Sequence, residues 1–362
     1  MDDHVEVLFK EARRRRHQRW FVGVSVVVAA AMAIFVIVQG GTKQSGNRLP
    51  AKAAGHSGAV VAPGAALDRP QAMAISADGN VLISNEGSNQ VLERLPSGRL
   101  DSVAGNGHVG FSGDGGPADA AALDDPQGIA VSSGGTIYVA DTGNNRIRVI
   151  ALSGIISTLA QLGNPSAVAV GPSHLLYVTD SAGLQSVSGN GAIATIIPAT
   201  TTRNGEITDQ LSVDGTSFAF FPNAVAVAPS GAIYVANSSP KLLLEDLDGV
   251  ISLIGQTPVL DGGTYVTPAG LAVAPDGSVY VGDYGYFSID QVTGTSLKRV
   301  FTFQRQSVPG LNGFRPSGIA VGHDGKIFAD TDGVNGGSNR PAVIRIVSRG
   351  RIELLDVGRV VH

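Results

Sequence analysis

The chain has 362 residues, 43% of them hydrophobic, and a formal net charge of −4. This length allows about two domains of roughly 150 residues each, or one long repeat domain. Cysteine is absent, which excludes a disulfide framework, a thiolate metal site and a cysteine nucleophile.

The first 38 residues have the charge pattern of a membrane-inserted segment. Arginines at positions 13–16 and 19 precede Trp20–Val38, nineteen residues without a charge. As a helix this run spans about 28 Å, close to the hydrocarbon core of a bilayer. Because the basic residues come first, the positive-inside rule places the N-terminus in the cytoplasm. We expect a cytoplasmic basic tail over 1–19 and a transmembrane signal-anchor helix over 20–38, in a single-pass cell-membrane protein whose remainder is extracytoplasmic.

Two other interpretations of this segment stay open. One is a cleaved signal peptide, since small residues such as Ala29, Ala31 and Ala33 resemble a cleavage site. They lie inside the apolar run, however, and the run is longer than the usual signal-peptide core. The other is a twin-arginine export signal, against which the acidic start and the bulky run after Arg19 argue.

Residues 39–66 are rich in Gly, Ala, Ser and Pro. This composition predicts a flexible linker with a reach on the order of 30 Å. The apolar run Ala59–Val61 has an alternative role as an outer strand that helps to close the domain beyond the linker.

One phrase repeats from Leu67 onward. In Pro126–Ile150, three short runs rich in β-branched residues are separated by Gly- and Asn-containing turns, and Ile155–Leu159 adds a fourth run. Such runs predict strands joined by tight hairpins. Copies of the phrase begin at Pro70, Pro126, Pro165, Pro222, Pro268 and Pro316. A unit of roughly 40 residues with four strands is typical of a propeller blade. The predicted fold is therefore all-β, a six-bladed β-propeller over 67–362, preceded by one N-terminal transmembrane helix.

The second repeat carries a family resemblance. Residues 104–150, AGNGHVGFSGDGGPADAAALDDPQGIAVSSGGTIYVADTGNNRIRVI, resemble the consensus of the NHL-repeat family. The resemblance extends over about residues 67 to 356 and is weakest in the third repeat, which lacks the Asn-x-Arg turn, as do the fourth and fifth. It implies a six-bladed propeller. It does not imply one function, because relatives include receptor ectodomains, RNA-binding modules and a lyase.

Strand direction predicts which loops share a face. The second strand of each repeat returns to the face where the first strand begins, so the long connections gather on that upper face. They are Gly105–Asp125, Ser188–Phe221, Gly255–Thr267 and Gln304–Arg315. Long loops on a rigid scaffold are where binding usually occurs.

A row of Asp and Asn side chains ends the second strands at this face. The row is Asn85, Asp141, Asp180, Asn237, Asp283 and Asp330, the last one residue early in its repeat. A ring of acids for cations is one interpretation. Because the feature recurs in every repeat, we favour structural caps that bond turn N–H groups. Asn144 and Arg146 are expected to help in the second repeat, with Arg146 either paired with Asp141 or directed into solvent.

The residue after each proline is the best ligand-binding candidate. These residues surround the mouth of the central channel and are polar but neutral, or small: Gln71, Gln127, Ser166, Asn223, Ala269 and Ser317. Such side chains suit hydrogen bonding of a neutral or polar ligand. Phe111 and Asp114 of the glycine-rich loop Ala104–Pro117 are further candidates, although a turn at Asp114 and packing of Phe111 against the blade are the simpler roles. This loop lacks the GK[ST] and following helix of a phosphate loop.

Catalytic signals are weak. No Asp, Glu or His falls on a predicted inner strand, and the propeller histidines, His108, His174 and His323, are too scattered for a zinc site. No metal, cofactor or catalytic residue is therefore predicted, and an enzyme is the less favoured interpretation. Residues 1–20 hold six Lys/Arg and four Asp/Glu, a net of +2, which leaves −6 for the rest of a chain whose total is −4. An acidic propeller argues against nucleic acid as a partner.

We conclude that the sequence favours a membrane-anchored extracytoplasmic binding module. Its expected ligand, on the upper face, is a protein, a peptide or an envelope glycan. The alternative is an extracytoplasmic hydrolase or lyase with catalytic residues on its loops. A scaffold without a small ligand is a third possibility, which a large exposed apolar patch would indicate.

Overall fold

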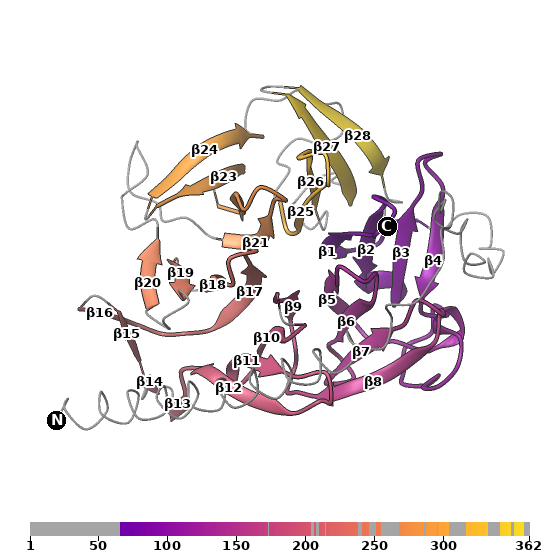
Figure 1. Cartoon of the computed structure of the whole chain (residues 1–362), viewed down its shortest axis with the longest axis horizontal. Helices are drawn as coiled ribbons and strands as arrows, with labels where there is room; N and C mark the ends of the chain where they lie inside the picture. The colour runs from indigo at the N-terminus through magenta and orange to yellow at the C-terminus, as the bar shows by residue number, and fades with distance from the viewer. Residues whose placement is uncertain are drawn as a thin grey trace, which may run out of the picture. The chain divides into compact units, whose positions relative to one another are not determined.

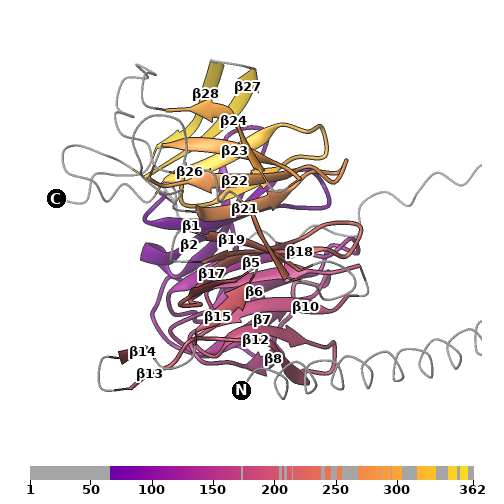
Figure 2. The ribbon, with the colours of Figure 1, turned by 90° about the vertical axis from the view of Figure 1, so that its left-hand side faces the viewer.

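The computed structural model describes residues 66–172, 174–203, 206–207, 210–213, 215–237, 241–245, 251–254, 268–285, 287–294, 296–303, 316–331, 341–348 and 351–357. All of them belong to a compact unit that spans 56–362, separate from a unit over 1–55. The sheets of this second unit form a ring. Figure 1 shows the ring face on, and Figure 2 shows it from the side.

Six four-stranded antiparallel sheets follow one another along the chain, each made of consecutive strands. Alternating β-branched residues and glycine-containing turns favour this hairpin arrangement. The first sheet is β1 (Pro70–Ile75), β2 (Val81–Asn85), β3 (Gln90–Arg94) and β4 (Leu100–Ala104). The second is β5 (Pro126–Val131), β6 (Ile137–Asp141), β7 (Arg146–Ile150) and β8 (Ile156–Gln161). The third is β9 (Ala167–Val170), β10 (Leu176–Asp180), β11 (Gly183–Val187) and β12 (Ile193–Pro198).

The remaining sheets keep this order. The fourth is β17 (Pro222–Val227), β18 (Ile233–Asn237), β19 (Lys241–Glu245) and β20 (Ile251–Ile254). The fifth is β21 (Pro268–Val273), β22 (Val279–Asp283), β23 (Ser288–Thr293) and β24 (Ser296–Thr302). The sixth is β25 (Ile319–Val321), β26 (Ile327–Thr331), β27 (Ala342–Ser348) and β28 (Arg351–Val357). Two hairpins, β13 (Thr202–Arg203) with β14 (Glu206–Ile207) and β15 (Leu211–Val213) with β16 (Thr216–Phe218), precede the fourth sheet.

The hydrophobic core lies between neighbouring sheets. One buried cluster joins each successive pair of sheets, and a further cluster joins the sixth sheet to the first. In that last cluster Met73 and Ile83 pack with Ala320 and Phe328. A four-stranded sheet cannot bury both of its faces by itself, so each sheet needs a neighbour on either side. The ring therefore closes through side-chain packing, and all four strands of the sixth sheet come from one stretch of chain.

Large side chains on the second strands fill these clusters. Leu82, Tyr177 and Phe328 are buried, and each packs toward the following sheet. Tyr138, Tyr234 and Tyr280 pack in the same way at partly buried positions. These aromatic side chains thus hold neighbouring sheets together and are not a ligand platform.

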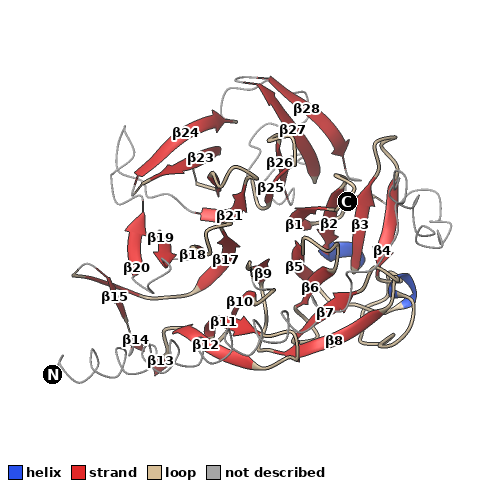
Figure 3. Ribbon diagram, in the orientation of Figure 1, coloured by secondary structure: helices blue, strands red, loops and turns tan. Residues whose placement is uncertain are grey.

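The predicted fold class needs correction. The prediction was a six-bladed propeller preceded by a transmembrane helix. Within the described residues, no helix has the length and apolar character needed to span a membrane. The only described helices are the 3-10 turns η1 (Glu86–Ser88) and η2 (Ala118–Ala120), as Figure 3 shows. The run Trp20–Val38 lies outside the described residues.

The described propeller also departs from a ring of equal repeating units. The inner strand β25 has three residues where β1, β5, β17 and β21 have six. The hairpin β15–β16 contributes Val213 and Phe218 to the core between the third and fourth sheets. Because insertions in surface connections cost little, such a hairpin can lengthen one repeat without disturbing its neighbours.

Candidate functional site

We call upper face the end of the ring where the inner strands begin and the second strands end. In β1, β5, β17 and β21, the pairing with the second strand shifts just after the leading proline, which is a β-bulge. The residues at these bulges are Gln71, Gln127, Asn223 and Ala269. A bulge redirects a side chain out of the regular pleat, and bulges are frequent next to binding sites.

We call mouth ring the six residues that follow the leading prolines. Its members are Gln71, Gln127, Ser166, Asn223, Ala269 and Ser317, and all are half-buried. The sequence predicted their position at one end of the channel. The bulge shared by Gln71, Gln127, Asn223 and Ala269 could not be predicted, because it depends on the register between two strands.

The first-sheet member of the mouth ring bonds a carboxylate. Gln71 Nε2 donates to Glu86 Oε2 at 2.5 Å, and Arg69 Nη1 lies 2.8 Å from Glu86 Oε1. Glu86, in the turn after β2, is a functional candidate that the sequence reasoning missed. One sequence signal could have identified it. Glu86 follows Asn85 directly, and at the same position the second, third and fifth repeats carry an uncharged residue: Thr142, Ser181 and Tyr284.

Other members of the mouth ring bond neutral groups or a buried acid. Ser166 Oγ lies 2.9 Å from Thr179 Oγ1. Asn223 Nδ2 donates to the Pro268 carbonyl of the next sheet at 3.2 Å. Ser317 Oγ donates to Asp330 Oδ1 at 2.7 Å. The Gln127 carbonyl accepts a bond from Ser84 Oγ of the first sheet. The mouth ring is therefore mostly polar. Among these bonds, its side chains donate to a carboxylate in the first sheet, Glu86, and in the sixth, Asp330.

The Asp/Asn row holds the connection that leads into each sheet. Asn85 Oδ1 accepts the Asp68 N–H at 2.8 Å, and Gly87 N–H donates back to the Asp68 carbonyl at 2.9 Å. In the second sheet, Asp141 Oδ1 likewise accepts the Asp124 N–H at 2.8 Å, and the Gly143 N–H donates to the Asp124 carbonyl at 2.9 Å. The prediction was a cap on the local turn. In these sheets the side chain instead fastens the incoming chain two residues before the proline.

The third to fifth sheets vary this contact. Asp180 accepts N–H groups from Gly163, in the incoming connection, and from Ala182 at 2.9 Å in its own turn. Asn237 Oδ1 accepts the N–H of the residue before Pro222 at 2.5 Å. Asp283 Oδ1 accepts the Gly285 N–H of its own turn at 2.9 Å. The side chains of this row are all buried, so these bonds replace solvent.

Asp330 does not belong to this row. In the second sheet, Asp141 lies two residues after Val139, which pairs with Ile129. In the sixth sheet the corresponding second-strand position is Ala329, and Asp330 lies one residue after it. Because side chains alternate along a strand, a shift of one residue moves a side chain to the opposite face of the sheet.

Asp330 consequently bonds the inner strand. Its Oδ1 accepts the Gly318 N–H at 2.5 Å as well as the Ser317 hydroxyl. An added Cβ on Gly318 would lie 2.8 Å from Asp330 Oδ2. The early position of Asp330 in its repeat was visible in the sequence, and this shift is its consequence.

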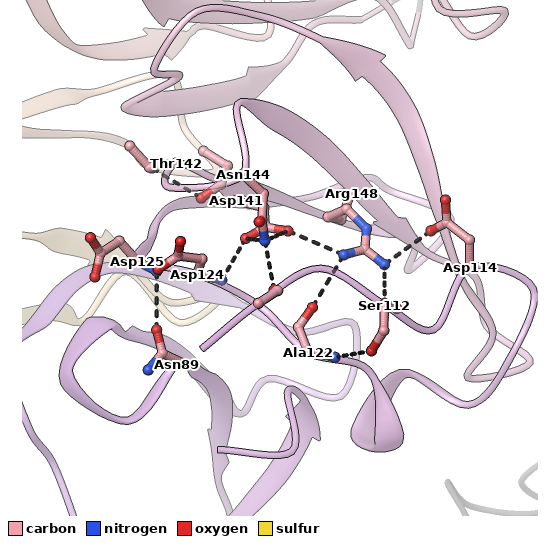
Figure 4. Close-up of polar contacts among 12 residues, drawn as sticks. Asn89, Ser112, Asp114, Ala122, Asp124, Asp125, Asp141, Thr142, Asn144 and Arg148 are labelled. Atoms are coloured by element: carbon pink, nitrogen blue, oxygen red, sulfur yellow. Dashed lines mark hydrogen bonds and ion pairs between the residues drawn. The ribbon is translucent and has the colours of Figure 1, made fainter. Parts of the chain in front are cut away.

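A buried arginine orders the glycine-rich loop between the first and second sheets. Arg148 is wholly buried and lies 3.1 Å from Asp141 Oδ2 and 2.9 Å from Asp114 Oδ1 (Figure 4). It also donates to the carbonyls of Ser112 and Ala122, at 3.0 and 3.5 Å. Arg148 thus ties the middle of the loop, at Ser112 and Asp114, to its end at Ala122. Asp114 therefore has a structural partner.

Arg146 has neither of the two predicted positions. Its guanidinium carbon lies 3.6 Å from the centroid of the Phe111 ring, a cation–π contact, while Arg148 lies 4.9 Å from the same ring. Phe111 remains 45% exposed. Asn144 Nδ2 bonds both carboxylate oxygens of Asp141, at 2.9 and 3.0 Å, and the carbonyl of Gly110 at 2.8 Å.

Two buried acids of the row have shifted pKa values. Burial raises the pKa of Asp141, against the bonds from the Asp124 N–H, Asn144 and Arg148. Burial likewise raises the pKa of Asp180, against bonds from backbone N–H groups and Gln185. In both cases the loss of carboxylate solvation raises the pKa by more than the hydrogen-bond donors lower it. These acids lie in structural contacts, so the shifts do not indicate catalysis.

Metal chemistry has little support in the part of the chain that is described. No group of three or more His, Asp or Glu side chains there could hold a metal ion. His108, His174 and His323 are exposed, and the last two lie in turns at the opposite end of the ring. The long connections 255–267 and 304–315 lie outside the described residues.

Comparison with known proteins agrees with this geometry. Residues 123–150, the linked strands β5 to β7, match the family model for the NHL repeat. The second sheet contains an NHL repeat. A 231-residue stretch is 26% identical to Teneurin-3 of Danio rerio and covers 49% of this chain and 8% of that protein. An 88-residue stretch is 31% identical to Protein SUPPRESSOR OF QUENCHING 1 of Arabidopsis thaliana, covering 24% and 8%. The chain thus spans less than a tenth of the length of these relatives.

Solved structures show the same fold at low identity. A streptogramin B lyase superposes with a TM-score of 0.53 at 17% identity, covering 81% of this chain and 84% of that one. A Bacteroides thetaiotaomicron protein of unknown function gives a TM-score of 0.55 at 15% identity, covering 80% and 72%. Virginiamycin B lyase from Staphylococcus aureus, as a catalytically inactive His-to-Ala variant with quinupristin, gives 0.51 at 15%, covering 79% and 84%. At these identities the likeness concerns the propeller fold alone.

Proposed function

We propose that this NHL propeller is a binding module whose ligand, a protein, peptide or envelope glycan, docks at the mouth ring of the upper face. The observation that carries this proposal is the bulge at Gln71, Gln127 and Asn223, which presents half-buried polar side chains at one end of the channel. A bulge changes the direction of a side chain relative to the regular pleat, and bulges are frequent next to functional sites. A few convergent polar groups in a concave frame are typical of ligand sites.

The rim around the mouth ring supports the same assignment. The loop over 105–125 is ordered by Arg148 and carries Phe111, 45% exposed, and Val109, 69% exposed. Exposed aromatic side chains next to ordered polar groups are common in recognition surfaces. A rigid loop also loses little conformational entropy when a ligand binds.

We further propose that the propeller acts outside the cytoplasm and does not bind nucleic acid. The basic cluster at 13–16 and the uncharged run at 20–38 support export of the chain beyond residue 38. Asp68, Asp124 and the exposed Asp125 line the incoming connections of the upper face, which disfavours a phosphate backbone. A reporter active only outside the cytoplasm, fused after His362, should be active, whereas a cytoplasm-only reporter at the same place should not.

Binding at the mouth ring can be tested with matched variants. Wild-type protein is compared on peptide and envelope-glycan arrays with the triple variant Gln71→Leu, Asn223→Leu, Ser317→Ala. The control is Asn190→Leu, in an exposed turn at the opposite end of the ring. We expect a ligand that the wild type and the control retain and the triple variant loses, at unchanged melting temperatures. A ligand that all three proteins retain would place binding elsewhere.

The hydrolase or lyase alternative is favoured by one observation, the likeness to streptogramin and virginiamycin B lyases. That likeness concerns the fold, and in this chain two of the three described histidines, His174 and His323, lie at the end of the ring opposite the mouth ring. The two functions differ in the fate of a ligand. Mass spectrometry after incubation of a bound ligand with protein should return it intact if the protein is a binding module, and converted if it is an enzyme.

A further inference from the structure

Arg146 differs from the other arginines of the propeller. Its guanidinium makes no hydrogen bond or ion pair with a described residue, and it lies over the Phe111 ring with its central carbon 3.6 Å from the ring centroid. Asp141, which pairs with Arg146 across the strands, already accepts bonds from Asn144 and Arg148. Every other arginine whose side chain is described bonds an oxygen atom of the protein: Arg69, Arg94, Arg99, Arg148, Arg299 and Arg345. The donors of Arg146 are therefore left for another molecule.

The outer edge of this guanidinium is accessible. Of its three nitrogen atoms only Nε is buried without a partner, so both Nη atoms reach solvent. Phe111, against which the group lies, is 45% exposed. Gln161 lies directly opposite Arg146 on β8, and its exposed side chain is on the same face of the sheet. A cation, an apolar ring and a neutral amide thus lie side by side at the upper end of the second sheet.

We propose that Arg146 binds a carboxylate group of a ligand, with Gln161 as a second donor and the exposed part of Phe111 in contact with an apolar group beside the carboxylate. A planar guanidinium matches the two oxygens of a carboxylate with two parallel hydrogen bonds. Stacking on Phe111 orders the guanidinium beforehand, so less side-chain entropy is lost on binding. The site lies on β7, two strands outward from Gln127 of the mouth ring, and it does not depend on the proposed function.

The charges around Arg146 favour a carboxylate over a phosphate. Asp114, 41% exposed, belongs to the same loop as Phe111, and its partner Arg148 lies 4.9 Å from the Phe111 ring. Asp124 and Asp125 follow in the connection into the second sheet. A phosphate monoester carries more than one negative charge at pH 7, so these acids repel it more strongly than a carboxylate. The C-terminus of a peptide and a uronic acid of a glycan both present a carboxylate.

Two matched pairs of probes test the proposal on the purified full-length chain. N-acetyl-glycyl-leucine is compared with its C-terminal amide, and glucuronate with glucose, by ligand-observed NMR titration. We expect the carboxylate of at least one pair to bind about tenfold more tightly than its neutral twin, the size of one charge-assisted bond. Added salt should reduce this difference. The pair that responds identifies a peptide or a sugar as the source. Equal binding within both pairs, no binding by either carboxylate, or tighter binding of inorganic phosphate overturns the proposal.

Variants assign the binding to Arg146. Arg146→Gln should remove the tenfold advantage of the responding carboxylate and leave its neutral twin unaffected. Arg146→Lys keeps the charge without the planar fork and should retain only part of the advantage. The control is Arg99→Gln, at an arginine that is paired with Asp101 at the surface, and it should bind both probes as the wild type does. A carboxylate that Arg146→Gln and the wild type bind equally would show that this arginine is not the site.

The neighbouring side chains give a second readout. Gln161→Leu should weaken the carboxylate about fivefold, the size of one neutral hydrogen bond, and Phe111→Leu should weaken it because the guanidinium loses its support. No effect of either change would contradict the site described here. All these variants leave the mouth ring intact, so their result stands whatever the mouth-ring variants show. Unchanged melting temperatures confirm that each variant is folded.

Discussion

Arg148 and Asp141 form an ion pair in which both side chains are wholly buried, with Nη1 and Oδ2 3.1 Å apart. One partner comes from the third strand of the second sheet and the other from the end of its second strand. Together they hold the loop over 105–125 against the second sheet (Figure 4). This buried ion pair therefore has a structural role, which is to hold the loop over 105–125 in place. The binding proposal relies on the pair only because it makes this loop rigid.

Removal of one member of this pair should destabilise the protein strongly. Arg148→Met leaves the buried Asp141 carboxylate without its ion-pair partner, and such uncompensated burial costs about 3–5 kcal/mol. The double variant Arg148→Met, Asp141→Asn should be less destabilised than the sum of its parts. Chemical denaturation gives the free energies of unfolding. The control is Arg99→Met, whose partner Asp101 lies at the surface and whose loss should cost about 0–1 kcal/mol. Equal costs for Arg148 and Arg99 would contradict the buried-pair argument.

The stability of Asp180→Asn should differ from wild type in a pH-dependent way. Because burial raises the pKa of Asp180 above its usual value of 3.8, the folded protein holds this proton more tightly than the unfolded chain. The Asp180 contribution to the free energy of unfolding is therefore largest below about pH 4 and falls as the pH rises through the raised pKa. Asparagine does not titrate, and it already occupies this place at Asn85 and Asn237.

The measurement is the melting temperature of both proteins from pH 3.5 to pH 7. The difference, Asp180→Asn minus wild type, should become more positive as the pH rises. All other groups titrate in both proteins, so the difference isolates Asp180. A difference that stays constant or falls with pH would show that the pKa of Asp180 is not raised.

Close approach of neighbouring inner strands should make Gly128 intolerant of a side chain. A Cβ at Gly128 would lie 2.6 Å from Ala167 Cα and 2.9 Å from the Val168 nitrogen, in the backbone of the third sheet. Gly128→Ala should therefore cost about 1–3 kcal/mol, as overpacking usually does. Gly189→Ala is the control, because a Cβ there meets nothing within 4 Å. Thermal unfolding compares the two variants, and similar melting temperatures would argue against the tight packing of inner strands.

Chelation should leave the propeller unchanged. The described residues hold no cluster of three possible metal ligands, and the buried acids Asp141 and Asp330 bond protein donors. We expect no bound metal by elemental mass spectrometry and the same melting temperature before and after EDTA. One equivalent of metal with a lower melting temperature after EDTA would favour the enzyme alternative and direct attention to the connections over 255–267 and 304–315.

Sequence reasoning went furthest where the pattern is local. The run of β-branched and apolar residues over Ile137–Asp141 predicts a strand, and the turn after Ser133 predicts a hairpin, because both depend on neighbours along the chain. The count from proline to acid also showed that Asp330 is one residue early. What this shift does could not be inferred, because the face on which a side chain lies depends on its register with a partner strand.

The amino-acid sequence by itself determined the repeating strands, their hairpins and the polar residues that come after each leading proline, since these depend on backbone preferences and on a period of two residues. Only the tertiary structure decided that Arg148 and not Arg146 meets Asp141, that Glu86 lies beside Gln71, and that the oxygen of Asn223 is left without a partner. Contacts of this kind join residues that are distant along the chain, from different strands and turns or from neighbouring sheets. Their distances depend on how these elements pack together, and no local pattern contains that information.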